Sequence, residues 1–248
     1  MNNHFKIVVP LYNVEKWIKL CIRSVKKQDY NNFECVLVDD ISTDKTVEII
    51  KKEIKNDNRF HLVVNKDKKL ALRNIYEGIE YLKPKHNDII ITLDGDDWLA
   101  GPSVLSFLNN KYKQEDCWLT YGSYMEHPSK KRGKFASKIP DNIIENQLYR
   151  SSPWMSSHLR TFKYGLWNKI NKEDLLDPKG NFFPMAWDLS FMFPMLEMAG
   201  KKSAFIEKVL YVYNRDNPIN DDKVNNFLQI SIEKYIREKE KYKELESL

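Results

Sequence analysis

Three carboxylates stand within four residues at Asp94-Gly95-Asp96-Asp97. Carboxylates this close repel one another, whereas a hard divalent cation such as Mg²⁺ or Mn²⁺ takes oxygen ligands and bridges them to phosphate groups. Asp and Gly are also ordinary turn formers, so an acidic surface turn is the alternative interpretation. We therefore treat this cluster as a candidate site for a divalent cation.

The acidic cluster needs an element to position it, and the preceding residues 88–94 are mostly aliphatic and β-branched, which predicts a buried strand. Further strands are expected at residues 5–12, 33–38 and 61–64 for the same reason. Between them, apolar residues recur three or four positions apart, which predicts helices at residues 14–25, 47–54 and 71–82.

This alternation of strand and helix predicts an α/β fold whose parallel sheet is covered by helices on both faces. In such sheets, ligands bind outside the carboxyl ends of the strands. The polar residues expected at those ends are Asn13, Asp39 and Asp40, residues 65–69, and Asp94 to Asp97. We therefore expect them to share one site.

The second half of the chain is less regular. We expect a strand at residues 118–125, a polar basic loop at 126–140, an apolar helix at 188–199 and a pair of strands within 204–213. A charged helix is expected at residues 223–248, with apolar residues on one side. Packing against the body, formation of a homo-oligomer and peripheral contact with a membrane are all compatible with such a helix.

Composition narrows the class of protein. The 248 residues are 42% hydrophobic, which suffices for the core of one large domain. The net charge of +5 comes from Lys and Arg mixed with Asp and Glu along the chain, which argues against a nucleic-acid-binding protein. Three cysteines without ligand spacing, no long apolar run and no signal-like N-terminus predict a cytoplasmic protein without a transmembrane segment.

Several short stretches resemble, in order and spacing, the motifs of glycosyltransferase family 2, whose members are inverting enzymes with a GT-A fold. These stretches are Val9-Pro-Leu-Tyr-Asn13, Val38-Asp-Asp-Ile-Ser-Thr-Asp44, Ala71-Leu-Arg-Asn74, Leu93-Asp-Gly-Asp-Asp97 and Trp187-Asp-Leu189. The resemblance covers residues 5 to about 215. It implies a Rossmann-like, mostly parallel central sheet flanked by helices, with a smaller irregular half on the acceptor side and a C-terminal helix.

The resemblance also implies a division of the chain. Residues 1–222 would form one GT-A domain, with a nucleotide-binding half at 1–100 and an acceptor-binding half at 101–222. Residues 223–248 would form the charged C-terminal helix.

By resemblance, the site residues divide into three groups. The nucleotide of the donor would be bound by Pro10, Tyr12, Asn13, Asp40, Lys68, Lys69, Arg73 and Asp96. Asp97, with Asp96, would hold Mn²⁺ or Mg²⁺. Asp188 falls where the family places its catalytic base, and Trp187, His158 and Arg160 are expected on the acceptor side.

Two positions depart from the family pattern. Trp187 replaces the Glu that usually precedes the catalytic Asp. Asp216 and Asn217 stand where many relatives have a His that completes the metal shell, and His158 is a candidate substitute. The third metal ligand therefore stays open.

The function that the resemblance implies is metal-dependent, inverting transfer of a sugar from a UDP-sugar, either a UDP-hexose or a UDP-N-acetylhexosamine. The acceptor would be a hydroxyl of a glycan, a lipid-linked molecule or a protein. A catalytically silent module that binds glycans or nucleotide sugars is one alternative. A sugar nucleotidyltransferase is another, although it needs a Gly-rich loop after the first strand, and residues 10–14 contain no glycine.

Overall fold

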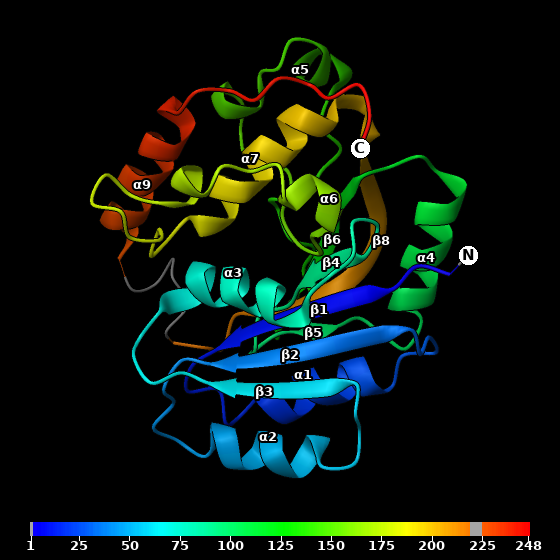
Figure 1. Cartoon of the computed structure of the whole chain (residues 1–248), viewed down its shortest axis with the longest axis vertical. Coiled ribbons are helices and arrows are strands. Elements are labelled where there is room, and N and C mark those ends of the chain that lie inside the picture. Colours follow the sequence, from blue (N-terminus) through cyan, green and yellow to red (C-terminus); the bar gives the residue numbers. More distant parts are fainter. Residues whose placement is uncertain (1, 219–224) are drawn as a thin grey trace.

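β1 (Phe5–Leu11) lies inside the sheet of the first half, and each of its side chains is buried. It pairs in parallel with β2 (Phe33–Asp39) on one side and with β4 (Ile89–Thr92) on the other. β3 (Phe60–Val64) extends the parallel part beyond β2. The computed structural model in Figure 1 describes residues 2–218 and 225–248. These four strands confirm the strand positions expected for the first half.

The second half continues the same sheet on one side, beyond β4. The full order is β3-β2-β1-β4-β7-β6-β8-β5. β7 (Thr161–Lys163) is antiparallel to β4 and to β6 (Leu119–His127), and β5 (Trp98–Leu99) is antiparallel to β8 (Ser203–Asn214). β6 and β8 are parallel. The sheet is therefore mixed, and the expectation of a mostly parallel sheet holds only for the first half, where helices connect successive strands.

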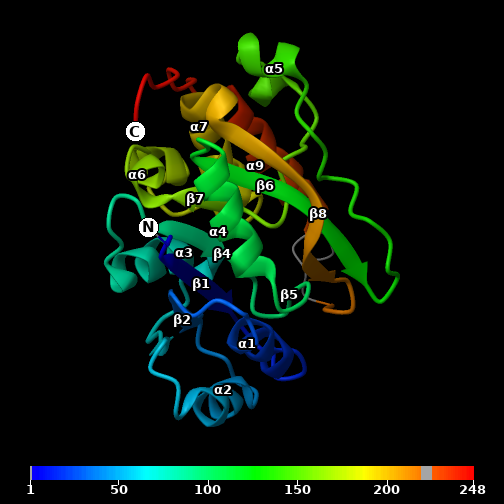
Figure 2. The ribbon, with the colours of Figure 1, turned by 90° about the vertical axis from the view of Figure 1, so that its right-hand side faces the viewer.

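Helices cover both faces of the sheet. In α1 (Ile18–Lys26) the buried residues fall three or four positions apart, so one face of the helix meets the sheet. α1 shares its core with α4 (Val104–Gln114). α3 (Leu70–Leu82) lies on the other face, where it shares a core with α7 (Trp187–Ala199). Figures 1 and 2 show α1 and α2 (Thr46–Ile54) at the opposite end of the molecule from α7 and α9 (Asn226–Glu238).

Short elements join these larger ones in the second half. They are α5 (Asp141–Glu145), η1 (Tyr149–Ser151), α6 (Tyr164–Trp167), η2 (Lys172–Leu175) and η3 (Gly200–Lys202).

Two expectations for the C-terminal region are corrected. Residues 204–213 belong to one long strand, β8, rather than to a pair of strands. The charged helix expected at 223–248 ends at Glu238, and the following residues run without helix along α7, where Leu245 donates to the carbonyl of Met198. Residues 219–224, part of the predicted boundary at 222, lie outside the described residues.

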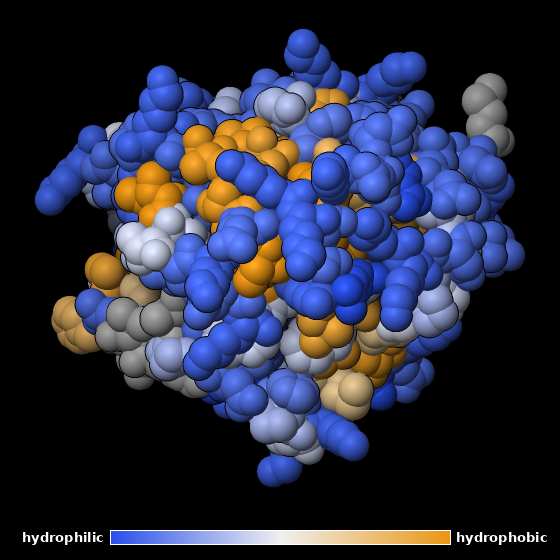
Figure 3. All heavy atoms as spheres, turned by 90° about the horizontal axis from the view of Figure 1, so that it is seen from below, coloured by the Kyte–Doolittle hydropathy of each residue, from blue (hydrophilic) through white to orange (hydrophobic). Residues whose placement is uncertain are grey.

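The surface seen from below is mainly hydrophilic, with hydrophobic groups gathered at a few places (Figure 3). α9 carries two strongly exposed hydrophobic side chains, Phe227 (84% exposed) and Ile230 (58%). Among the residues that the structure describes, no helix is both long and apolar enough to span a bilayer.

Candidate active site

The acidic turn connects β4 to β5, and the end of β1 fixes its shape. Asp97 donates its backbone N–H to the carbonyl of Asp94, and Gly95 donates to the carbonyl of Pro10 at 3.1 Å. A Cβ at Gly95 would lie 2.5 Å from the Cβ of Leu11. Glycine is therefore required here because β1 approaches the turn too closely for any side chain.

Asp97 lies beneath the surface and is held by β8. Its side chain accepts hydrogen bonds from the Tyr211 hydroxyl at 2.5 Å and from the Asn214 backbone N–H at 2.7 Å. Burial raises the pKa of Asp97 well above its usual value, and the negative charges of Asp96 and Asp94 add to that rise. A carboxylate in this setting would be stabilised by a nearby cation.

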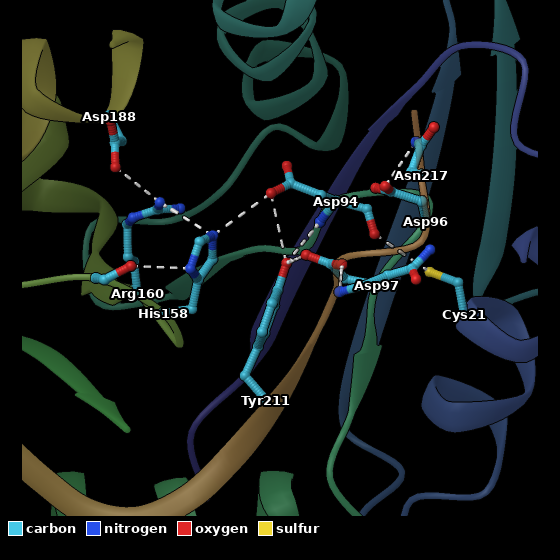
Figure 4. Close-up of polar contacts among 11 residues, drawn as sticks. Cys21, Asp94, Asp96, Asp97, His158, Arg160, Asp188, Tyr211 and Asn217 are labelled. Atoms are coloured by element: carbon cyan, nitrogen blue, oxygen red, sulfur yellow. Dashed lines mark hydrogen bonds and ion pairs between the residues drawn. The ribbon is translucent and has the colours of Figure 1, made fainter. Parts of the chain in front are cut away.

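Three potential ligand atoms converge at the turn, from Asp94, Asp97 and His158 (Figure 4). They lie within 4.8 Å of one another. Two carboxylate oxygens and one imidazole nitrogen suit Mn²⁺ or Mg²⁺, of which Mn²⁺ accepts nitrogen more readily. The donor set therefore fits the predicted cation. His158 belongs to this group as the candidate third ligand, and the group contains Asp94 rather than Asp96. The Asp96 carboxylate accepts from Asn217 at 2.7 Å, and its part in holding the cation stays a prediction.

His158 is fixed by its neighbours as a neutral ring. Burial lowers the pKa of His158, and the adjacent Arg160 lowers it further. Arg160 Nη2 lies 3.1 Å from His158 Nε2, and arginine only donates, so Nε2 is the acceptor. Nδ1 then carries the proton and donates to Ser157 Oγ at 2.9 Å. The same Nε2 lies 3.5 Å from Asp94 Oδ2.

Asp188 lies in the first turn of α7 and contacts the same arginine. Arg160 Nη2 donates to Asp188 Oδ2 at 2.8 Å. The side chain of Arg160 is 3% exposed, that of Asp188 is 18% exposed, and the Arg160 guanidinium lies 5.4 Å from the ring centre of Trp187. The residues predicted for the acceptor side therefore meet the predicted base within one contact network, as Figure 4 shows for the labelled ones.

A cavity of about 670 Å³ opens over this network. Its lining includes the predicted residues Pro10, Tyr12, Asp40, Lys68, Asp96, His158, Arg160, Trp187 and Asp188. Asn74, Tyr213, Asn217, Leu228 and Gln229 also line it. The ends of β1, β2 and β4 thus form one side, while α7, β8 and α9 form the other.

Asp40 organises the loop before α3. Its carboxylate accepts from the backbone N–H groups of Lys69 at 2.8 Å and Leu70 at 2.9 Å, and from Asn65 Nδ2 at 3.0 Å. Burial raises the pKa of Asp40, but these hydrogen bonds lower it by more, so its pKa lies below the usual value and the carboxylate stays charged. Lys68 lies beside it with Nζ 3.6 Å from Asp40 Oδ2 and over the ring of Tyr12.

Three residues predicted to bind the nucleotide have other contacts. Lys69 Nζ and Arg73 Nε both pair with Glu77, at 2.6 and 2.8 Å. Asn13 accepts from the backbone of Thr43, which ties the loop after β1 to the loop after β2. Among the described residues that line the cavity, none of these three side chains is present.

Sequence reasoning missed the residues that hold the acidic cluster from β8. Tyr211 and Asn214 are separated from Asp97 by more than a hundred positions, and they meet it because β5 pairs with the end of β8. The signal available in the sequence was the run of aromatic and then polar residues at 211–217, at the end of an expected strand. Asn65 was expected at this edge of the sheet, but its hydrogen bond to the Asn74 side chain beside Asp40 was not predicted.

Comparison with known proteins agrees with this geometry. The sequence matches the family described as Glycosyl transferase family 2 over residues 6–172, and the chain belongs to that family. Glycosyltransferase GlyG of Streptococcus pneumoniae is 30% identical over 127 residues, which cover 51% of this chain and 41% of GlyG. The poly(ribitol-phosphate) beta-N-acetylglucosaminyltransferase TarS of Staphylococcus aureus is 34% identical over 102 residues, covering 38% of this chain and 16% of TarS.

Solved structures share the fold. TarS 1-349 in complex with UDP-GlcNAc has a TM-score of 0.62 at 18% identity, covering 86% of this chain and 58% of that one. The mannosyltransferase PcManGT of Pyrobaculum calidifontis, in complex with GDP-Man and Mn2+, has a TM-score of 0.59 at 18% identity and covers 86% and 57%. These likenesses confirm the expected α/β fold. The chain spans less than two thirds of each of these relatives.

Proposed function

We propose that this chain is a cation-dependent, inverting glycosyltransferase that moves a sugar from a UDP-sugar to an acceptor hydroxyl. The observation that carries the proposal is the single cavity in which the Asp40 loop, the acidic turn and Asp188 face the same space. Family membership supports the reaction class.

The nucleotide side favours a uridine donor. Asp40 is a charged, buried acceptor at the carboxyl end of β2, and a carboxylate there can accept from the imide N–H of uracil. Tyr12 and Lys68 lie beside it and would contact the base and the phosphates. The relative TarS, which was solved with UDP-GlcNAc, supports a UDP-N-acetylhexosamine, whereas PcManGT with GDP-Man marks guanosine as the competitor to test.

The cation would be Mn²⁺ or Mg²⁺, held by Asp94, Asp97 and His158, with Asp96 close to the donor. When bound, such a cation neutralises charge on the leaving diphosphate. Tyr211 and Asn214 orient Asp97 toward it, and Ser157 fixes the ring of His158. Their role is to hold the ligand atoms in place before the donor arrives.

Asp188 would act as the general base. It takes the proton of the acceptor hydroxyl as that oxygen bonds to the anomeric carbon and the bond from this carbon to the diphosphate oxygen breaks. One base is enough when the configuration inverts, whereas retention through a covalent intermediate needs two carboxylates about 5 Å apart across the sugar. Arg160 holds Oδ2 of Asp188 and Trp187 borders the same space, as expected for the acceptor side.

The acceptor would enter between α7 and α9. Leu228 and Gln229 of α9 line the cavity, and the exposed Phe227 and Ile230 lie on the same helix. A glycan, a lipid-linked molecule and a protein remain the three acceptor classes. The division into residues 1–100 for the nucleotide and 101–222 for the acceptor stays part of this proposal.

Release of nucleotide from different donors tests the proposal. The chain is incubated with UDP-, GDP- and dTDP-sugars, with Mn²⁺, Mg²⁺ or EDTA, and free nucleotide is measured. We expect UDP-sugars to release UDP only with a cation. Binding without release would favour the silent module, and formation of a sugar nucleotide from a sugar phosphate and a nucleoside triphosphate would favour the nucleotidyltransferase.

A further inference from the structure

Arg160 touches both the predicted base and the predicted cation ligand. We propose that Arg160 occupies the cation-facing nitrogen of His158 until a nucleotide diphosphate offers its guanidinium another partner, and that Arg160 thereby couples cation binding to donor binding. This inference rests on the proposed function, because it assumes that the donor carries a diphosphate. It assigns Arg160 to the donor as a coupling residue, in addition to the acceptor-side role expected from the sequence.

Arg160 lies between the candidate cation ligands and the proposed base. It directly precedes β7, and its side chain contacts His158 and Asp188 of α7. The side chain is only 3% exposed, yet the residue lines the cavity. Nε of Arg160 is buried without a hydrogen-bond partner among the described residues. A buried guanidinium with an unused N–H beside a cavity is suited to an anionic ligand.

His158, as a neutral ring, offers a single lone pair. A neutral imidazole has one acceptor nitrogen, and here Nε2 accepts from Arg160 while Nδ1 donates to Ser157. The same Nε2 lies 3.5 Å from Asp94 Oδ2, and His158 forms the candidate ligand group with Asp94 and Asp97. One lone pair serves one partner at a time. The contact seen here and ligation of a cation are therefore mutually exclusive.

Arg160 is a fixed positive charge beside the ligand cluster, so it opposes a divalent cation that approaches alone. A nucleotide diphosphate brings negative charge to the same space and can accept from the guanidinium in a charge-assisted bond. Arg160 can then leave Nε2 without losing an acceptor. Cation and diphosphate are thus expected to strengthen each other's binding, and by linkage the effect is reciprocal.

Two dissociation constants of purified protein test this role. One is for Mn²⁺ without nucleotide, from the electron paramagnetic resonance signal of free Mn²⁺. The other is for UDP at saturating Mn²⁺, from calorimetry. In Arg160→Met we expect Mn²⁺ alone to bind about tenfold more tightly, because a like charge is removed. We expect UDP with Mn²⁺ to bind about tenfold more weakly, because a charge-assisted bond is lost.

Tighter Mn²⁺ binding together with weaker UDP binding distinguishes this role from a structural one, because a damaged site would bind both ligands more weakly. Arg23→Met is the matched control: it removes the same side chain from the surface of α1, where Arg23 pairs with Glu53, and should leave both constants within about twofold. Arg160→Gln, which keeps a donor for Asp188, replaces the first variant if that one does not fold.

Mn²⁺ binding that is unchanged or weaker in the folded Arg160 variant would overturn the inference, and so would unchanged UDP binding. The proposed function would survive either result, provided that the wild-type chain still releases UDP in a cation-dependent way. If the wild-type chain shows no cation-dependent binding of UDP, the proposed function itself fails.

Discussion

Tyr211 contacts two of the three carboxylates of the acidic turn. Its hydroxyl donates to Asp97 at 2.5 Å and lies 3.4 Å from Asp94 Oδ2. The ring is fully buried and stacks on His158, with ring centres 4.5 Å apart. One residue of β8 therefore touches all three candidate ligands, and we infer that it sets their mutual positions.

Tyr211→Phe should weaken Mn²⁺ binding by roughly 10- to 100-fold, the usual effect of losing a partner that orients a metal ligand. The ring remains, so the fold should persist. Titration with Mn²⁺ in the presence of UDP measures the effect. Tyr121→Phe is the control, because that buried hydroxyl accepts from Ile139 away from the site. Equal Mn²⁺ affinity of the Tyr211 variant and the wild-type chain would show that this hydroxyl orients nothing.

Asp188→Asn should bind UDP with Mn²⁺ as tightly as the wild-type chain but turn over about 10² to 10⁴ times more slowly, because a general base is lost. Calorimetry gives the binding and UDP release gives the turnover. Near-native turnover would remove Asp188 as the base.

At the residue scale, residues in short motifs could be predicted from the sequence, whereas residues that act through long-range contacts could not. Asp97, Asp188 and Asp40 were predicted because they stand in motifs that follow strands or begin a helix. Lys69 and Arg73 stand in the expected stretch too, but Glu77 offers Arg73 a partner one helical turn away. Tyr211 could not be assigned, because its role depends on a strand pairing that no local pattern encodes.

At the scale of elements, α7 carries the proposed base, Asp188, at one end and contacts the C-terminal segment at the other. Near its C-terminus Glu197 is fully buried and pairs with Arg150 at 2.6 Å. Arg150 also donates to the carbonyl of Ile236 in α9, and Glu197 accepts from the backbone of Tyr242. This buried pair therefore fixes α9, whose side chains line the cavity.

Glu197→Gln should lower the free energy of unfolding by about 3–5 kcal/mol, because it leaves Arg150 buried without a counter-ion. Thermal or denaturant unfolding measures the loss. Glu233→Gln should cost less than about 1 kcal/mol, since its pair with Arg237 on α9 is partly exposed. A loss of the same size in both variants would contradict the special role of the buried pair.

The elements of the first half were predictable because apolar residues recur in each at the spacing typical of a strand or a helix. The alternation of strands and helices then indicates βαβ connections. α1, α3 and β1 to β4 lie close to where their apolar patterns placed them. β5 and β7 have two and three residues, which is too short for any period. Their antiparallel pairing depends on tertiary contacts, and this made the sheet mixed.

At the scale of the whole molecule, the two halves form opposite sides of one cavity. The parallel half supplies Asp40 and the acidic turn, and the less regular half supplies His158, Arg160 and Asp188. Neither half contains all the groups that the proposed reaction needs. The proposed chemistry therefore depends on how the mixed sheet joins the halves through β4 and β7.

The most direct test is the affinity for UDP, measured by calorimetry with and without Mn²⁺, for the wild-type chain and for Asp97→Asn. The substitution keeps the size of the side chain and its acceptor for Asn214, but removes the charge. We predict that Mn²⁺ strengthens UDP binding at least tenfold in the wild-type chain and has little effect in the variant. Equal UDP affinity with and without Mn²⁺ in the wild-type chain would contradict the account.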